Sequence, residues 1–209
     1  LAEAEKSGLD VFPVSRSAFS SLSGKDNPSG IGLVIQQIFC GLDSVSLEKG
    51  DLWIVLDQIA DPGNLGTIMR TLDACGGRGI ILINQCTDPF DPTAIRASTG
   101  AVFHLDIVKT ESPGFISWQK STDVKLVGAV AVPGALDYHS YIYSDPILLM
   151  MGSEREGLHP DLARICDQTV FIPMVGHVDS LNLAEATAIV LYEIFNQHRT
   201  VKVKIGVQT

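Results

Sequence analysis

The chain is organised around one stretch near its C-terminal end: Pro173-Met-Val-Gly-His-Val-Asp-Ser-Leu-Asn-Leu-Ala-Glu-Ala-Thr-Ala-Ile-Val-Leu-Tyr-Glu193, continued to Arg199. It starts with turn-forming residues and becomes an almost uninterrupted apolar helix. Asp179 or Ser180 can cap that helix, and Glu185 favours the positive end of its dipole. A helix that is apolar nearly all round is buried, either in a core or against another subunit. By its local pattern alone, the stretch is an ordinary C-terminal core helix.

Upstream of this helix, short apolar runs alternate with helical patterns. Strands are predicted at residues 31–38, 52–56, 79–83, 102–108, 125–130, 146–151 and 169–172, and helices at residues 64–75, 92–99, 112–121 and 159–165. Near-continuous apolar strands that alternate with helices favour a parallel sheet covered on both faces, so the predicted fold class is α/β. Residues 15–23 are a candidate short helix, and the alternating residues 201–205 are either an extra strand or a disordered end.

The composition limits what the protein can be. The chain has 209 residues, 45% of them hydrophobic, which fits one globular domain, alone or with a small appendage. It contains no apolar run long enough to cross a bilayer and no signal-peptide pattern. Cys40, Cys75, Cys86 and Cys166 show neither metal-ligand nor CxxC spacing and indicate reduced thiols of an intracellular protein. The net charge of −9 disfavours a stand-alone nucleic-acid-binding module, which usually presents a basic surface.

Three polar loops follow predicted strands, at the edge where parallel sheets bind their ligands. The first runs from Asp57 to Arg70, the second from Met151 to Leu158 and the third from Ile172 to Asn182. Each loop has an ordinary alternative as a solvated turn or a helix cap, with Asn64 as the cap in the first. Asn64 and Arg70 stand about two helical turns apart, which predicts that they lie on roughly the same side of the helix.

Several common signatures are absent from the sequence. Neither GxGxxG nor GxxxxGK[ST] occurs, which disfavours a nucleotide-dependent oxidoreductase, the enzyme class that an α/β fold alone suggests. The five histidines are too scattered to suggest a metal site, and no Ser/His/Asp or Cys/His grouping is readable. We therefore expect no bound metal.

Together the three loops resemble the SpoU (TrmH-like) family of RNA ribose methyltransferases, within the SPOUT superfamily. The family's motifs stand here as Asn64-Leu-Gly-Thr-Ile-Met-Arg-Thr71, Leu149-Met-Met-Gly-Ser-Glu-Arg-Glu-Gly-Leu158 and Ile172-Pro-Met-Val-Gly-His-Val-Asp-Ser-Leu-Asn-Leu-Ala-Glu-Ala186. Arg96-Ala-Ser-Thr-Gly-Ala101 also resembles a family segment. The resemblance covers roughly residues 30–198, in the family's order and spacing. It departs at residues 183–185, where many members have Val-Ser before a small residue.

The resemblance implies a parallel α/β sheet whose C-terminal part forms a deep trefoil knot, which general topology rules would not predict. It also implies S-adenosylmethionine as the cofactor, held in a bent shape by the loops of the knot. The implied cofactor-binding residues are Val132, Gly134, Gly152, Ser153, Gly157, Ile172, Met174, Ser180 and Leu181. The implied catalytic residues are Arg70, Asn64, Glu154, Ser180 and Asn182.

The implied activity is S-adenosylmethionine-dependent methylation of a ribose 2′-hydroxyl in RNA. Ribosomal RNA is the expected substrate and transfer RNA the alternative. A non-catalytic RNA-binding or scaffold member of the same fold is a second alternative, which the intact motif residues disfavour. Like other members, the chain is expected to form a homodimer through part of residues 183–198. We expect it to act in the cytoplasm, with a mitochondrion or plastid as the alternative.

The chain begins at Leu1 and not at Met, which suggests a fragment or a processed product. Many family members carry an N-terminal RNA-binding domain. Residues 1–28 are expected to be its remnant or a linker, residues 29–199 the methyltransferase domain, and residues 200–209 a tail. The acidic charge then fits a chain that lacks most of its RNA-binding surface.

Arg70 is the residue expected to carry the chemistry. Family proposals have the matching arginine activate the 2′-hydroxyl, sometimes as a general base. A guanidinium stays protonated in ordinary protein sites, which argues against the base role. We expect its planar fork to hold the substrate phosphate and to stabilise negative charge on the ribose oxygen, with Asn64 and Glu154 fixing its orientation.

Overall fold

The computed structural model describes residues 3, 6–23, 27–45, 47–130 and 132–199, and internal contacts divide the chain into two units. Leu1–Gln37 form the first unit and Ile38–Thr209 the second. The domain boundaries expected after residues 28 and 199 stay predictions. The tail at residues 201–205, predicted as a strand or a disordered end, lies outside the described residues.

The first unit contains the helix α2 (Arg16–Ser23), as residues 15–23 predict, and none of its residues is buried. The strand predicted at residues 31–38 is wrong, because no residue from 31 to 39 is in regular secondary structure. Leu33 and Val34 are 83% and 103% exposed. An apolar run of this kind favours a strand only where a neighbouring strand pairs with it and a covered face receives its side chains. The described residues provide neither for this run.

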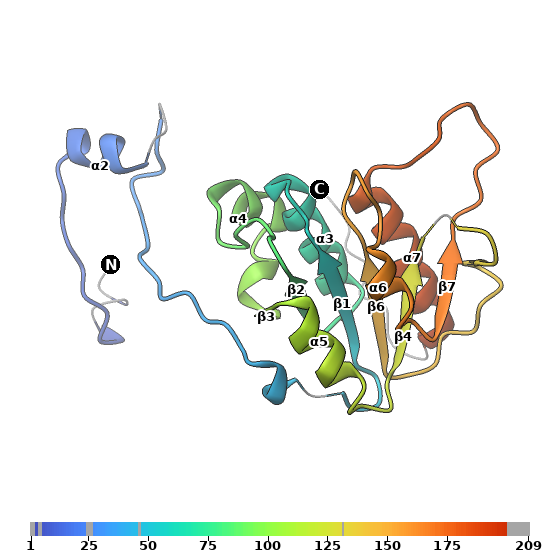
Figure 1. The fold of residues 1–209 in the computed structure, drawn as a ribbon. Coiled ribbons are helices and arrows are strands. Elements are labelled where there is room, and N and C mark those ends of the chain that lie inside the picture. The colour runs from blue at the N-terminus through green and yellow to red at the C-terminus, as the bar shows by residue number, and fades with distance from the viewer. Residues whose placement is uncertain (1–2, 4–5, 24–26, 46, 131, 200–209) are drawn as a thin grey trace. The chain divides into compact units, whose positions relative to one another are not determined.

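The second unit is built on a seven-stranded sheet whose neighbouring strands are all parallel, in the order β3-β2-β1-β6-β4-β7-β5 (Figure 1). Its strands are β1 (Leu52–Asp57), β2 (Gly79–Ile83), β3 (Asp106–Thr110), β4 (Lys125–Ala129), β5 (Leu136–Asp137), β6 (Ile147–Met151) and β7 (Gln168–Phe171). Its described α-helices are α3 (Pro62–Ala74), α4 (Pro92–Ser98), α5 (Ser112–Gln119), α6 (Pro160–Ala163) and α7 (Leu183–His198), and short 3₁₀ helices lie at Leu42–Ser44 and Ala101–Phe103. The predicted α/β class is confirmed.

Helices cover both faces of this sheet (Figure 1). Successive residues of β1 point to opposite faces. Ile54 and Leu56 join a core with α3, α4 and α7, whereas Trp53 and Val55 join a second core with α5 and α6. Burial on both faces is the reason that residues 52–56 form a continuous apolar run rather than an alternating one.

The N-terminus of α7 differs from the prediction. Its cap is Asn182, whose Oδ1 accepts a hydrogen bond from the N–H of Ala184 at 2.8 Å. The expected caps, Asp179 and Ser180, are wrong because helical geometry begins only at Leu183. The predicted position of Glu185 in the first turn is confirmed.

Only one side of α7 faces the core. Val190, Leu191 and Ile194 are buried there, while Tyr192 is 46% exposed. The ring of Tyr192 packs edge-on against that of Phe195, with 5.9 Å between the ring centroids. The helix is therefore a core helix that also carries apolar side chains on its outer side.

Two further element boundaries differ from the sequence prediction. Helix α3 starts at Pro62 because Asp61, and not Asn64, is its cap: Asp61 Oδ1 accepts a hydrogen bond from the N–H of Asn64 at 2.7 Å. Strand β3 starts at Asp106 and not at Val102, because a 3₁₀ helix takes up the residues before it. Strand β5 has only two residues, too few to produce a period-2 pattern, so the sequence does not predict it.

The strand order reverses beside the central strands β1 and β6. Strands β2 and β3 continue the sheet on the β1 side, and β4, β7 and β5 continue it on the β6 side. In open α/β sheets, ligands bind beyond the carboxyl ends of the strands at such a reversal. The knot implied by the family resemblance stays a prediction. Among the described residues, no helix combines the length and the apolar character needed to span a bilayer.

Candidate active site

A large open cavity lies beyond the carboxyl ends of the central strands. Its volume is about 510 Å³, and it is lined by Ala129, Met151, Gly152, Ser153, Glu154, Gly157, Ser180, Leu181, Asn182, Leu183 and Ala186. Its walls therefore come from the ends of β4 and β6, the loop after β6, the loop before α7 and the first turn of α7. Ligand sites of this size are usual for small molecules and cofactors.

A chain of side-chain hydrogen bonds joins the three polar loops at this cavity. Asn182 Nδ2 donates to Asn64 Oδ1 at 3.1 Å, and Asn64 Nδ2 donates to Glu154 Oε1 at 3.0 Å. Asn64 is 118 positions from Asn182 and 90 positions from Glu154 in the sequence, yet its side-chain amide bonds to both. Asn182 is further fixed because its Oδ1 caps α7.

The loop from Gly152 to Gly157 folds back on itself and brings Glu154 to this chain. Ser153 and Gly157 exchange two backbone hydrogen bonds of 3.0 and 3.1 Å. A Cβ on Gly152 would lie only 2.1 to 2.2 Å from backbone atoms of Gly157 and Leu158, so this close approach requires glycine. Gly157 has φ of +68°, a second conformation that favours glycine.

Arg70 lies on α3 with its side chain exposed to solvent, and it does not line the cavity. It stands six positions after Asn64, which in an α-helix is about 9 Å along the axis and roughly 120° around it. The expectation that both lie on the same side of the helix is therefore wrong. The expectation that Asn64 and Glu154 orient Arg70 is also not met, because those two side chains bond to each other. Within the described chain, Arg70 has neither an ion pair nor a hydrogen bond from its side chain.

Helix α4 packs closely beside α3. A Cβ on Gly66 would lie 2.4 Å from the carbonyl oxygen of Ala94 and 2.6 Å from Cβ of Ala97. Residues four apart in an α-helix lie on neighbouring positions of one face, so Arg70 follows Gly66 by one turn on the side of α4. The small residue in the first motif thus sets how near α4 comes to Arg70.

Asp57, the last residue of β1, is a buried titratable group and is 2% exposed. Burial raises the pKa of its carboxyl group, and a hydrogen bond from Asn84 and the proximity of His159 oppose that rise only in part. No group of three or more His, Cys, Asp or Glu side chains is placed to hold a metal ion in the described part of the chain.

Comparison with known proteins identifies the family. The model of the SpoU rRNA methylase family matches residues 51–192. The chain belongs to this family. It is 35% identical over 176 residues to the 23S rRNA (uridine(2479)-2′-O)-methyltransferase of Streptomyces viridochromogenes, a match that covers 81% of this chain and 61% of that protein. The chain therefore spans less than two thirds of that relative.

This chain covers a larger share of two further similar proteins. The 23S rRNA (guanosine(2553)-2′-O)-methyltransferase RlmP of Bacillus subtilis is 30% identical over 189 residues, which are 90% of this chain and 74% of that protein. The crystal structure of an AdoMet-bound rRNA methyltransferase from Sinorhizobium meliloti superposes with a TM-score of 0.89 at 37% identity and covers 95% of this chain and 76% of that one. The predicted SpoU membership is confirmed.

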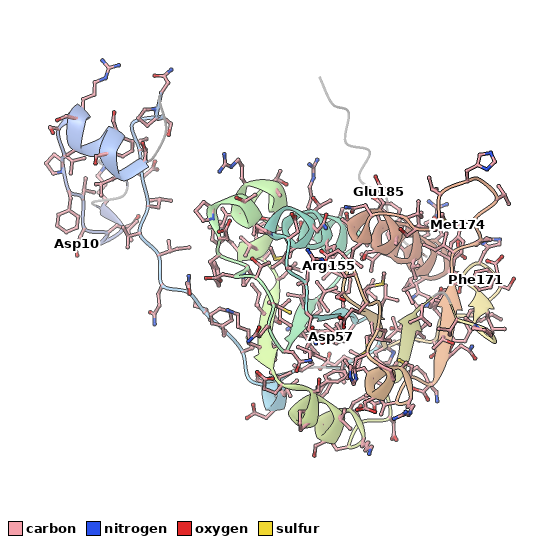
Figure 2. The ribbon with its side chains drawn as sticks, turned by 45° about the horizontal axis from the view of Figure 1, so that its top comes forward. Asp10, Asp57, Arg155, Phe171, Met174 and Glu185 are labelled. Carbon is pink, nitrogen blue, oxygen red and sulfur yellow. The ribbon has the colours of Figure 1, made fainter. Side chains whose placement is uncertain are left out.

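The structure brings together part of the predicted cofactor set. Gly152, Ser153, Gly157, Ser180 and Leu181 line the cavity of this SpoU chain. Val132, Gly134, Ile172 and Met174 do not line it. Met174 lies on the loop between β7 and α7, where Figure 2 labels it, and is 37% exposed. The roles of all these residues stay predictions.

Four lining residues, Ala129, Met151, Leu183 and Ala186, were not named as site residues from the sequence, although all but Ala129 lie within the motifs quoted above. Ala129 and Met151 end the neighbouring strands β4 and β6, and Leu183 and Ala186 lie in the first turn of α7. Their apolar character is indistinguishable in sequence from that of core residues. The usable signal was position, because residues at the carboxyl ends of adjacent parallel strands share one edge of the sheet.

Proposed function

We propose that this chain transfers a methyl group from S-adenosylmethionine to a ribose 2′-hydroxyl in RNA, with ribosomal RNA as the substrate. The observation that carries the proposal is the hydrogen-bonded link of Asn182, Asn64 and Glu154, which joins the three family motifs at the rim of one cavity. The 2′-O-methyltransferase names of the Streptomyces and Bacillus relatives support the reaction type and the class of RNA.

The cavity suits the proposed cofactor. Its volume of about 510 Å³ falls in the range of small-molecule sites. Leu181, Leu183 and Ala186 offer apolar surface, while Ser153, Ser180 and the backbone at Gly152 offer hydrogen-bonding groups. Glu154 adds a carboxylate that complements a cationic ligand. When bound, S-adenosylmethionine supplies a methyl group already activated by its sulfonium.

The tasks left to the protein are positioning and charge stabilisation. The residues around the site would have to align the ribose oxygen with the methyl group and its sulfur leaving group, and the hydroxyl proton would pass to solvent. Alignment of oxygen, carbon and sulfur should therefore dominate the rate enhancement. The Asn182–Asn64–Glu154 link supports such alignment because it fixes three loops against one another before the ligands bind.

Arg70 is the proposed charge-stabilising group. Its guanidinium has no competing partner in the described chain and is free to meet a phosphate or a developing oxyanion. We expect Arg70→Ala to reduce the single-turnover rate by about a hundredfold or more, which equals about 2.7 kcal/mol or more of barrier. Arg70→Lys, which keeps the charge but not the fork, should recover only part of the rate. Affinity for S-adenosylmethionine should hardly change, because Arg70 lies outside the cavity.

The test combines methylation of RNA with calorimetric titration of S-adenosylmethionine, and NAD serves as the control ligand. Mapping of the methylated nucleotide then distinguishes ribosomal from transfer RNA. A near-normal rate in Arg70→Ala would contradict the proposed role, whereas loss of cofactor binding would make Arg70 structural. Absence of both methylation and cofactor binding in the unaltered protein would refute the proposed function.

We also propose a homodimer and an N-terminal RNA-binding domain. The apolar outer side of α7, with exposed Tyr192 and half-buried Ile189, supports a subunit interface. A net charge of −9 disfavours tight RNA binding by this chain, which supports a separate RNA-binding domain of which residues 1–28 are the end. The bacterial ribosomal RNA relatives make the cytoplasm the proposed site of action.

A further inference from the structure

One aromatic ring stands exposed on the 3₁₀ helix that follows α4. Phe103 is 53% exposed, although the other two residues of that helix, Ala101 and Val102, are only 4% and 2% exposed. Within the described part of the chain, the ring of Phe103 stacks on no other ring. A single exposed apolar side chain is common in proteins and does not by itself indicate a ligand, so the surroundings of this ring have to carry the argument.

The turn before Phe103 holds its backbone in place. Helix α4 is followed by two successive left-handed residues, Thr99 with φ of +50° and Gly100 with φ of +97°. Such a φ is uncommon for a β-branched residue and persists only where the surrounding structure imposes it. The N–H of Phe103 donates to the carbonyl oxygen of Gly100 at 3.0 Å. Because the backbone is already fixed, a ligand that stacks on this ring has to order only the side chain.

Arg70 leaves α3 beside this ring. Helix α3 contacts α4 through Gly66, and Asp73 Oδ1 lies 3.7 Å from Nδ1 of His104, the residue after Phe103. Arg70 follows Gly66 by four residues and precedes Asp73 by three, so these three lie on one face of α3. That face is turned toward α4 and the 3₁₀ helix, both of which pack against α3. Figure 1 shows α4 next to α3.

Two arginines close to the ring have no counter-ion. Arg70 and Arg96, the latter in the last turn of α4, are exposed and form neither an ion pair nor a side-chain hydrogen bond with the described residues. The aspartates that begin the same two helices are already used, because Asp61 caps α3 and Asp91 caps α4. A chain of net charge −9 thus leaves two guanidinium groups unneutralised near an exposed ring. This combination fits RNA, whose phosphates bind arginine and whose unpaired bases stack on aromatic rings.

We infer that Phe103 is a base-stacking residue: its ring binds an unpaired base of the substrate RNA, beside the nucleotide whose phosphate Arg70 holds. The inference rests on the proposed function for the identity of the ligand as RNA. It goes beyond that function because Phe103 belongs to none of the motifs quoted above and does not line the large cavity. An unpaired base is the ligand because a base inside a duplex already stacks on its neighbours.

The first test compares RNA binding by Phe103→Ala and by the unaltered protein. The probe is a fluorescently labelled single-stranded RNA oligonucleotide, followed by anisotropy at about 50 mM salt, where electrostatic binding is strong enough to measure. Stacking tolerates any base, so a generic sequence serves. We expect Phe103→Ala to bind roughly tenfold more weakly. With the same RNA annealed to its complement, the two proteins should differ by no more than about twofold.

Conservative exchanges separate stacking from mere apolar contact. Phe103→Tyr keeps the flat ring and should bind single-stranded RNA within about threefold of the unaltered protein. Phe103→Leu keeps an apolar side chain without the ring and should lose about as much affinity as Phe103→Ala. Ile142→Ala is the matched control, because Ile142 is an apolar side chain that is 83% exposed and lies between β5 and β6. Its affinity for RNA should stay within about twofold of the unaltered protein.

Salt dependence distinguishes the ring from a phosphate contact. For single strands, each phosphate contact contributes about 0.7 to the slope of log affinity against log salt concentration. Phe103→Ala should therefore lower the affinity by one factor at every salt concentration and leave the slope unchanged, whereas Arg70→Ala should reduce it. Affinity for S-adenosylmethionine should stay within about twofold in Phe103→Ala, which shows that the fold of the site is intact.

The outcomes distinguish this inference from the proposed function. If Phe103→Ala binds single-stranded RNA like Ile142→Ala, or if Phe103→Leu binds it as well as Phe103→Tyr, the inference is overturned. A change of oligomeric state in Phe103→Ala with unchanged RNA affinity also overturns it, because the ring then belongs to a protein interface. If the unaltered protein binds RNA but methylates none, the proposed function fails, and the Phe103 comparisons still decide the inference. Absence of RNA binding in the unaltered protein overturns both.

Discussion

Gly152→Ala tests the geometry of the site most directly. The added methyl group would lie 2.1 to 2.2 Å from the carbonyl carbon and oxygen of Gly157 and the nitrogen of Leu158. These are backbone atoms and cannot rotate away. The 152–157 loop must therefore open, and opening strains or breaks the two backbone hydrogen bonds between Ser153 and Gly157.

The expected magnitude follows from those contacts. Two hydrogen bonds contribute about 1 to 3 kcal/mol together, and overpacking of a close contact costs a similar amount. A loss of about 2 kcal/mol in the free energy of unfolding lowers Tm by about 4 to 8 °C in a domain of this size. Because Gly152 and Gly157 line the large cavity, affinity for S-adenosylmethionine should fall by at least about tenfold, or 1.4 kcal/mol.

Calorimetry provides both measurements, by thermal unfolding and by cofactor titration. Gly176→Ala is the matched control, because a Cβ on Gly176 meets nothing within 4 Å and its φ is not in the left-handed region. That variant should stay within about 0.5 kcal/mol of the unaltered protein. If Gly152→Ala matches Gly176→Ala in both Tm and affinity, the close approach does not shape the site and the reasoning is refuted.

Three further outcomes follow from the structure and the charge. Light scattering at micromolar concentration should give a dimer, and Tyr192→Asp on the outer side of α7 should shift it toward monomer; a monomeric unaltered protein contradicts the proposed interface. At physiological salt the chain alone should bind RNA weakly, and extension with the proposed N-terminal domain should steepen the salt dependence of binding; nanomolar binding by the chain alone contradicts this. Burial raises the pKa of Cys75 to about 11 and that of Cys166 to about 12, so few thiolates form below those values. Iodoacetamide at pH 8, followed by mass spectrometry, should therefore label both cysteines far more slowly in the native than in the unfolded protein. Equal labelling rates would show that the two thiols are accessible.

The sequence predicts the central sheet because its strands are buried on both faces. Residues 52–56 and 79–83 read as continuous apolar runs, and the helices between such runs appear by their period and their caps. The same reasoning fails for residues 31–38, whose composition is that of a strand but which pair with no strand in the part of the chain that the structure describes. Whether a run of residues forms a strand depends on the segment that pairs with it, and that segment cannot be identified from the run alone.

The candidate site divides in the same way. The residue types at Asn64, Glu154 and Asn182 are readable from the motifs, but the hydrogen bonds that join them span 90 and 118 positions. From their spacing in the sequence, Asn64 and Arg70 were predicted to lie on roughly the same side of a helix. The observed start of α3 at Pro62 puts both inside it, roughly 120° apart.

The α/β class, the order of most elements and the family motifs are readable from the residues alone, because burial and turn chemistry act on neighbouring residues. The strand ends that meet, the partners of Asp57, Asn64 and Asn182, and the position of the cavity follow from the packing of distant segments. Those features depend on the order of strands in the sheet, where β6 lies between β1 and β4 although it follows both in the chain. Contacts between segments so far apart in the sequence are fixed by the packing of the whole sheet and leave no local signal.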